Sequence, residues 1–144
     1  GTVGSLRNLK SFSEDDLFLI NCDIIYNIDL ADFYHFHKRN KNDITIVASD
    51  KEYVIPYGVC HLKKSGSLKK ITEKPGFDFL INTGLYLLNK KIIKLIPKKK
   101  LFDTPSLINI ANSKGYKVGV YPIGETNWMD TGQWTELNKI AELI

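Results

Sequence analysis

The chain has 144 residues, of which 43% are hydrophobic and 25% charged, and its formal net charge is +4. These values are ordinary for one soluble globular domain over residues 1–144, and the mild charge suits anionic small molecules without predicting a nucleic-acid surface. No apolar run approaches the ~20 residues of a membrane span, and two cysteines without a zinc-type pattern indicate reduced thiols, so we expect a cytoplasmic protein that binds no membrane.

The first half of the chain predicts a strand, a helix and a second strand. Residues 1–10 are expected to form a glycine-rich turn and a short helix, followed by a polar connector at 11–16. The apolar run at 17–21 is typical of a strand buried on both faces of a sheet, and residues 44–48 repeat this pattern. Residues 30–41 have the apolar spacing of a helix. This order predicts a βαβ unit with a right-handed crossover.

The second half predicts a hairpin and then further alternating elements. A loop is expected at 49–56, and Ser65-Gly66 marks the turn of a hairpin at 57–72. The later elements that we expect are a strand at 85–88, helices at 90–96 and 105–114, an edge strand at 117–121, a strand end and turn at 128–132, and a closing helix at 135–144.

Several polar residues suit one chemistry. Asp23 and Asp130 each follow a hydrophobic strand, and a carboxylate at such a place can hold Mg²⁺ beside a phosphate. An Asp after a strand also commonly caps the following loop, so the pattern alone leaves both roles open. Glu73 and Lys74 are neighbours at the end of the predicted hairpin, where a simple exposed ion pair worth at most about 1 kcal/mol is the alternative. Together these residues suit a magnesium-dependent phosphate transfer.

The same stretches resemble the sugar-phosphate nucleotidyltransferases, also called nucleotide-sugar pyrophosphorylases. The resemblance covers nearly the whole chain, with the motifs in the family's order. It implies a Rossmann-like three-layer α/β/α fold with a mixed, mainly parallel sheet. The matching segments are GTVGSL at 1, LFLINCDII at 17, YGV at 57, ITEKP at 71, INTGLYLL at 81 and WMDTGQW at 128.

The resemblance also implies a reaction and a site. A sugar 1-phosphate attacks the α-phosphate of a nucleoside triphosphate, and a nucleotide sugar and pyrophosphate form without a covalent enzyme intermediate. Asp23 and Asp130 would hold Mg²⁺, and Lys74 would neutralise the sugar phosphate. The substrate-binding residues that it implies are Gly1 and Gly4 at the nucleotide, and Gly58, Glu73, Lys74, Asn82, Thr83 and Gly84 at the sugar side.

Two departures from the family pattern matter. Residue 22 is usually Gly in the strand-end motif, whereas here it is Cys22. The family also begins with a strand and a glycine-rich loop that carries an Arg and a later Lys, which cradle the triphosphate, and nothing here matches that part. We therefore expect a fragment of a catalytic domain that lacks its N-terminal part, is inactive alone, and has an exposed sheet edge through which it could form a homo-oligomer.

The sequence also suggests a nearest subfamily and two alternative functions. The closest likeness is to bacterial members joined to regulatory CBS domains, some of which are guanylyltransferases of surface-glycan pathways. One rival is a non-catalytic module that keeps sugar-phosphate binding, which turnover by the full-length protein would exclude. The other rival is nucleic-acid binding through lysines at 63–64, 69–70 and 98–100. These lysines lie at predicted turns without an aromatic strand motif, so we expect no nucleic-acid partner.

Overall fold

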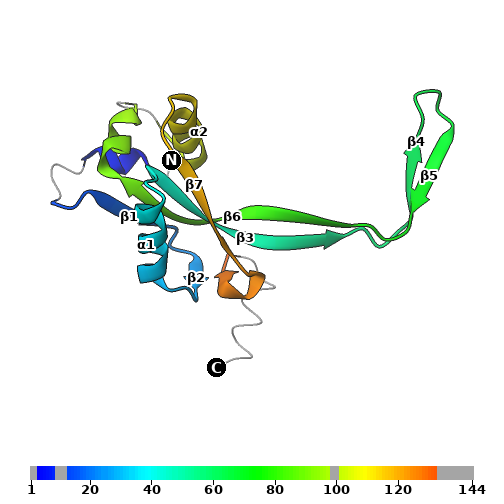
Figure 1. Cartoon of the computed structure of the whole chain (residues 1–144), viewed down its shortest axis with the longest axis horizontal. Coiled ribbons are helices and arrows are strands. Elements are labelled where there is room, and N and C mark those ends of the chain that lie inside the picture. The colour runs from blue at the N-terminus through cyan, green and yellow to red at the C-terminus, as the bar shows by residue number, and fades with distance from the viewer. Residues whose placement is uncertain (1–2, 9–12, 98–100, 133–144) are drawn as a thin grey trace.

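The centre of the structure, a computed structural model that describes residues 3–8, 13–97 and 101–132, is a four-stranded sheet. Its strands are β1 (Asp16–Ile20), β3 (Ile44–Val54), β6 (Gly76–Asn89) and β7 (Val118–Ile123). They lie in the order β1-β6-β3-β7 (Figure 1). Strand β6 runs against both of its neighbours while β3 and β7 are parallel, so three of the four strands share one direction. The predicted mixed, mainly parallel sheet is confirmed for these strands.

The remaining elements surround this sheet. The two α-helices are α1 (Leu30–Arg39) and α2 (Thr104–Ser113), and the 3-10 helices are η1 (Gly4–Asn8), η2 (Lys90–Leu95) and η3 (Glu125–Asn127). Two separate strand pairs are formed by β2 (Ile24–Tyr26) with β8 (Trp128–Asp130), and by β4 (Val59–Leu62) with β5 (Leu68–Thr72). Within the described ranges, no helix has the length and apolar character needed to cross a bilayer. The predicted helix at 135–144 lies outside the described residues.

Helix boundaries follow local capping chemistry. The carboxylate of Asp29 accepts hydrogen bonds from the backbone amides of Ala31 and Asp32, and so begins α1. Asp103 caps α2 in the same way, and Pro105 occupies the first turn of that helix, where a missing amide proton costs nothing. These contacts confirm both predicted helices to within two residues or so at each end. The predicted helix at 90–96 is a 3-10 helix.

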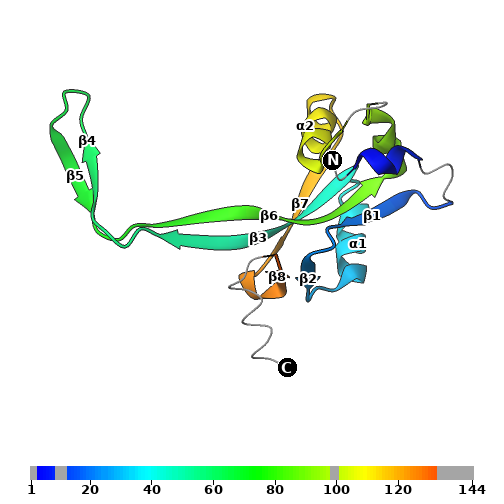
Figure 2. The same cartoon turned by 180° about the vertical axis from the view of Figure 1, so that it is seen from behind.

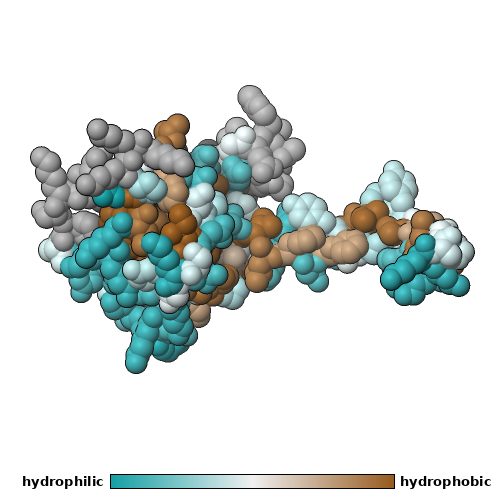
Figure 3. Space-filling model, turned by 90° about the horizontal axis from the view of Figure 1, so that it is seen from above, coloured by the Kyte–Doolittle hydropathy of each residue, from teal (hydrophilic) through white to brown (hydrophobic). Residues whose placement is uncertain are grey.

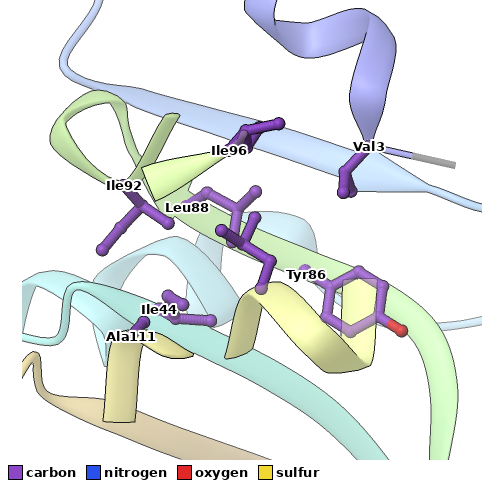
Figure 4. Packing of buried hydrophobic residues seen from close by; sticks show 8 residues of the cluster. Val3, Ile44, Tyr86, Leu88, Ile92, Ile96 and Ala111 are labelled. Carbon is purple, nitrogen blue, oxygen red and sulfur yellow. The ribbon is translucent and has the colours of Figure 1, made fainter. Parts of the chain in front are cut away.

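Two hydrophobic clusters cover opposite faces of the sheet. Leu85 and Leu87 of β6 point to the α1 side, where they pack with Phe33, Val47 and Ile123. The alternate residues of β6 point to the α2 side (Figure 4). The α2-side cluster consists of Val3, Ile44, Tyr86, Leu88, Ile92, Ile96, Leu107 and Ala111. Alternation along β6 therefore produces the three-layer α/β/α arrangement that the resemblance implied.

The segment 49–56, predicted as a loop, is instead largely strand. Strand β3 continues to Val54 and pairs with the first half of β6, so that 50–54 and 76–80 form a two-stranded ribbon that leaves the body. The β4–β5 hairpin lies at the outer end of this ribbon (Figure 2). The predicted strand at 85–88 was likewise too short, because β6 begins at Gly76. Prediction failed here because the ribbon has no buried apolar run.

The ribbon has one aromatic and one acidic face. Tyr53 and Phe77 are cross-strand partners, and the Tyr53 and Phe79 rings lie 5.9 Å apart in an edge-on arrangement. On the opposite face, Glu52 pairs with Asp78. The aromatic side chains are about half exposed, and apolar surface follows the ribbon outward from the body (Figure 3). The alternation of Phe77, Asp78 and Phe79 is the sequence signal that could have indicated this half of the ribbon.

A buried polar network joins α1 to the sheet. His37 is 1% exposed, and its Nδ1 lies 2.7 Å from the Thr45 hydroxyl, which accepts a hydrogen bond from the Asn42 amide. We infer that the Thr45 hydroxyl donates to Nδ1, which leaves the proton on Nε2, 3.5 Å from Asp16. Lys38 donates to the same Asp16 carboxylate at 2.7 Å. The network satisfies each of these buried groups, as burial requires.

The network predicts a pH dependence of stability. Burial lowers the pKa of His37 from its ordinary value of 6.5, against the opposing attraction of Asp16. As the pH falls below about 6.5, the unfolded chain therefore binds a proton that the folded chain resists, and the free energy of unfolding should fall. Denaturant titrations between about pH 5 and 7.5 measure this slope. It should disappear in His37→Gln and persist in His35→Gln, which changes an exposed residue of the same helix. Equal slopes in both variants would contradict the assignment.

Candidate functional site

Two carboxylates meet where β2 and β8 pair. Ile24 is the cross-strand partner of Asp130, which places Asp23 beside it. The Thr131 amide and hydroxyl both donate to the Asp23 carbonyl, at 2.9 and 2.8 Å, and so hold the two strand ends together. A Cβ built on Gly132 would lie 3.1 Å from Asp130 Oδ1 and 4.0 Å from Asp23 Oδ2. One oxygen of each carboxylate therefore lies within 4.0 Å of the same point.

The donor set of this pair suits a hard cation. Asp23 is exposed and Asp130 half-buried, so ligands can reach the carboxylates from solvent. The described part of the chain contains no group of three or more His, Cys, Asp or Glu residues that could hold a metal. Mg²⁺ typically takes one or two carboxylates and completes its shell with water and substrate phosphate. Two oxygen-bearing side chains at an accessible junction fit that mode of binding.

Tyr26 connects the carboxylate junction to the central sheet. Its hydroxyl donates to the Thr83 carbonyl at 2.7 Å, and the Thr83 hydroxyl donates to the Val47 carbonyl at 2.9 Å. Burial raises the pKa of Tyr26 to about 12, so this hydroxyl keeps its proton and remains a donor at neutral pH. The chain of contacts fixes β2, which follows Asp23, against β6 and β3. Sequence reasoning missed Tyr26, because a single aromatic residue in a short strand carries no motif.

The segment of Asn82, Thr83 and Gly84 forms a bend inside β6. Gly84 has φ +89, a left-handed conformation that favours glycine, and its amide donates to the Asn82 side-chain oxygen at 3.2 Å. The Asn82 amide nitrogen donates to the Tyr86 hydroxyl at 2.7 Å. Opposite this bend, the register of β3 shifts between residues 46 and 48. The Asn21 amide donates to the Gly84 carbonyl at 3.1 Å, which brings the bend to the end of β1.

The other predicted substrate residues lie far from the carboxylates. Gly58, Glu73 and Lys74 are close to one another: a Cβ on Gly58 would lie 2.9 Å from Glu73 Oε2, and the Lys74 amide donates to the Tyr57 carbonyl at 3.3 Å. They occupy the junction between the ribbon and the β4–β5 hairpin (Figure 1). At the ordinary rise of a strand, residues 76–82 of β6 alone span roughly 20 Å. The structure therefore does not bring these three residues to Asp23 and Asp130.

The predicted nucleotide-side glycines have no described place near the carboxylates. Gly1 lies outside the described residues. Gly4 begins η1, whose Arg7 donates to the Ile96 carbonyl and packs the 3-10 helix on the α2 side of the sheet. Cys22, directly before Asp23, and Cys60, on the β4–β5 hairpin, are both free and exposed thiols. Neither cysteine has a metal-ligand cluster around it in the described ranges.

Comparisons with known proteins identify a family and several relatives of this chain. A family model described as nucleotidyl transferase matches residues 1–144. A mannose-1-phosphate guanyltransferase of Yarrowia lipolytica is 32% identical over 146 aligned residues, and mannose-1-phosphate guanylyltransferase 1 of Arabidopsis thaliana is 30% identical over 141. Each alignment covers 92% of this chain, and the chain spans 38% of the length of these curated relatives.

Solved structures share the fold. HddC from Yersinia pseudotuberculosis superposes with a TM-score of 0.69 at 22% identity, over 99% of this chain and 62% of that one. A second crystal structure of HddC, complexed with GMP-PN, gives a TM-score of 0.68 at 21% identity. At this identity the likeness concerns the fold alone.

The contact between Asn21 and Gly84 predicts a specific stability difference. A Cβ on Gly84 would lie 2.6 Å from the Asn21 side-chain nitrogen, whereas a Cβ on Gly115, at φ +80, would meet nothing within 4 Å. Gly115→Ala should therefore cost about 1 kcal/mol of unfolding free energy through backbone strain alone, and Gly84→Ala should cost clearly more. In an Asn21→Ala background most of this difference should disappear, because only the Asn21 Cβ, 3.2 Å away, then remains near the new methyl group; chemical denaturation measures the change. An unchanged difference in that background would show that Asn21 is not the obstacle.

Proposed function

Because this chain belongs to the nucleotidyltransferase family, we propose that its parent protein makes a nucleotide sugar and pyrophosphate from a nucleoside triphosphate and a sugar 1-phosphate. The single observation that carries this proposal is the junction of β2 and β8, which brings Asp23 and Asp130 to one place. The phosphate oxygen of the sugar 1-phosphate attacks the α-phosphate, the bond to the β-phosphate breaks, and pyrophosphate leaves. This chemistry depends on positioning and charge neutralisation more than on a nucleophilic side chain.

Each part of the junction has a role in this proposal. Asp23 and Asp130 would hold Mg²⁺, which when bound neutralises charge on the triphosphate. The Thr131 contacts to the Asp23 carbonyl keep the carboxylates together before substrate arrives, so less reorganisation is needed on binding. Tyr26 anchors the same junction to β6, beside Asn82 and Thr83 on the sugar side.

Guanosine triphosphate and mannose 1-phosphate, or a related sugar 1-phosphate, are the substrates that we propose first. The support is that the curated relatives are named for mannose 1-phosphate and guanylyl transfer, and that one structural neighbour was crystallised with GMP-PN. We also propose that the protein acts in the cytoplasm and contributes to the synthesis of surface glycans. The chain spans only 38% of such relatives, so we further propose that it lacks the triphosphate cradle and does not turn over by itself.

A non-catalytic sugar-phosphate-binding module is the second candidate. The observation that favours it is the separation of Glu73 and Lys74 from the carboxylates along the ribbon (Figure 2). In the catalytic proposal, Glu73 contacts the sugar and Lys74 its phosphate only after the ribbon bends toward the body. Such bending is least costly at the base of the ribbon, where Gly84 has a left-handed backbone and the register of β3 shifts between residues 46 and 48. Turnover by the full-length protein distinguishes the two candidates.

Removal of either carboxylate should abolish most turnover. In the full-length protein, Asp23→Asn and Asp130→Asn should each lower kcat at least ~100-fold, because an amide neutralises no cation charge. Asp50→Asn, which changes an exposed carboxylate of the ribbon, should leave kcat within about 2-fold. The readout is pyrophosphate release over a matrix of nucleoside triphosphates and sugar 1-phosphates with Mg²⁺, with the 144-residue chain assayed alongside. Full activity of Asp23→Asn would contradict the proposed site.

Bending of the ribbon can be measured between the two natural cysteines. Cys22 lies beside Asp23 and Cys60 lies on the hairpin, and both are free and exposed. With nitroxide labels on both, the distance should shorten when the full-length protein, with any further cysteines replaced by Ser, receives sugar 1-phosphate, triphosphate and Mg²⁺. Inorganic phosphate alone should leave it unchanged.

A second label pair controls for label bulk beside Asp23. Cys22→Ser combined with Asn112→Cys moves one label to the exposed end of α2, and the Asn112–Cys60 distance should also change on substrate binding. An identical distance distribution with and without substrates, in both label pairs, would refute bending and favour the binding module.

A further inference from the structure

Three polar side chains gather on the α2 side of the sheet at the end of β1. The Tyr86 side chain belongs to the α2-side cluster and is 3% exposed, and its hydroxyl accepts a hydrogen bond from the Asn82 amide. The Asn82 oxygen in turn accepts from the Gly84 amide. Asn21 is packed against Gly84 and is exposed. Asn21 thus places one exposed side-chain amide next to the Gly84 bend and two residues before Asp23.

The Asn21 side chain is positioned by packing, and its amide group remains available for hydrogen bonding. Its backbone amide donates to the Gly84 carbonyl at 3.1 Å, and its side-chain atoms fill the space in which any Cβ on Gly84 would stand. The side-chain amide of Asn21 forms no hydrogen bond with the described residues. An amide that is fixed by its backbone and by packing, yet keeps both a donor and an acceptor open, is pre-organised to bind a polar group.

We propose that Asn21 determines sugar specificity by hydrogen-bonding one ring hydroxyl of the sugar 1-phosphate. This inference rests on the proposed function and deepens it. A sugar hydroxyl both donates and accepts, and a side-chain amide is the neutral group that offers both in return. Asn21 lies between the Gly84 bend and Asp23. Under the proposed function, a sugar 1-phosphate whose phosphate reaches the carboxylates would have its ring beside Asn21.

A specificity role differs from a structural role in its dependence on the substrate. An enzyme site that hydrogen-bonds a hydroxyl discriminates against the analogue that lacks it, because a polar group of the site is then left without its partner. Removing that polar group abolishes the discrimination. A structural defect at the end of β1 would instead slow all substrates by a similar factor.

The experiment measures kcat/KM of the full-length protein for its best sugar 1-phosphate and for the set of its monodeoxy analogues. In the wild type, one analogue should lose roughly 10- to 100-fold. In Asn21→Ala, that analogue and the parent sugar should be used equally well, while the ratios for the other analogues and the KM of the triphosphate stay unchanged. Asn112→Ala, at the exposed end of α2, should keep the wild-type pattern, and Asn21→Gln serves as a second variant that keeps the amide but displaces it.

The outcomes separate the two proposals. Discrimination that survives in both Asn21 variants, with a uniform loss over all sugars, overturns the role of Asn21 and leaves the nucleotidyltransferase proposal standing. Absence of pyrophosphate release by the wild type with every triphosphate and sugar 1-phosphate overturns the proposed function, and the role of Asn21 with it. Loss of discrimination for one hydroxyl alone supports both.

Discussion

Strand β6 is the element on which the rest of the structure depends, because it is hydrogen-bonded on both edges where it crosses the body. Residues 85–89 pair with β1, and most of them also pair with β3. Their alternate side chains supply both clusters: Leu87 points to the α1 side and Leu88 to the α2 side, each fully buried. Burial of one such side chain stabilises a fold by about 1.5–3 kcal/mol. Shifting β6 by one residue would exchange the two faces, so its register fixes both layers at once.

The candidate site is built where this regular pairing ends. At Gly84 the backbone turns into a left-handed conformation, and β6 changes from a central strand to one half of a ribbon. The hydrogen bonds from Tyr26 to the Thr83 carbonyl and from Thr83 to the Val47 carbonyl hold β2, β6 and β3 together next to this irregularity. A hydrogen bond of this kind contributes only about 1 kcal/mol net, but leaving a buried donor unpaired costs about 1–3 kcal/mol. Order at the site therefore comes from satisfied polar groups, whereas stability of the body comes from apolar burial.

Sequence reasoning succeeded where burial dictates the pattern and failed where it does not. The apolar runs at 17–21 and 44–48 correctly predicted two strands of the sheet, and residues 44–48 are largely buried as expected. The prediction that 17–21 is buried on both faces was wrong, because β1 lies at the edge of the described sheet and leaves Phe18 and Ile20 37% and 49% exposed. The ribbon was missed because its exposed strands have no buried run, although Phe77 and Phe79 alternate with Asp78. The proximity of Asp23 to Asp130 was predicted from the family resemblance, because no local sequence pattern indicates that strands more than a hundred residues apart will pair. Asn21 and Tyr26 gave no motif at all.

The length of the ribbon sets how far the hairpin would move if the ribbon bends as proposed. The bending point that we propose is the bend around Gly84, and the residues at the outer end include Gly58 and Glu73. Because the ribbon is roughly 20 Å long, a rotation of about 20° at this bend would move its outer end by about 7 Å. Small repacking at the base is thus converted into a large displacement at the outer end. Substitutions of a few residues near this bend would therefore change the position of the β4–β5 hairpin without changing the hydrophobic body.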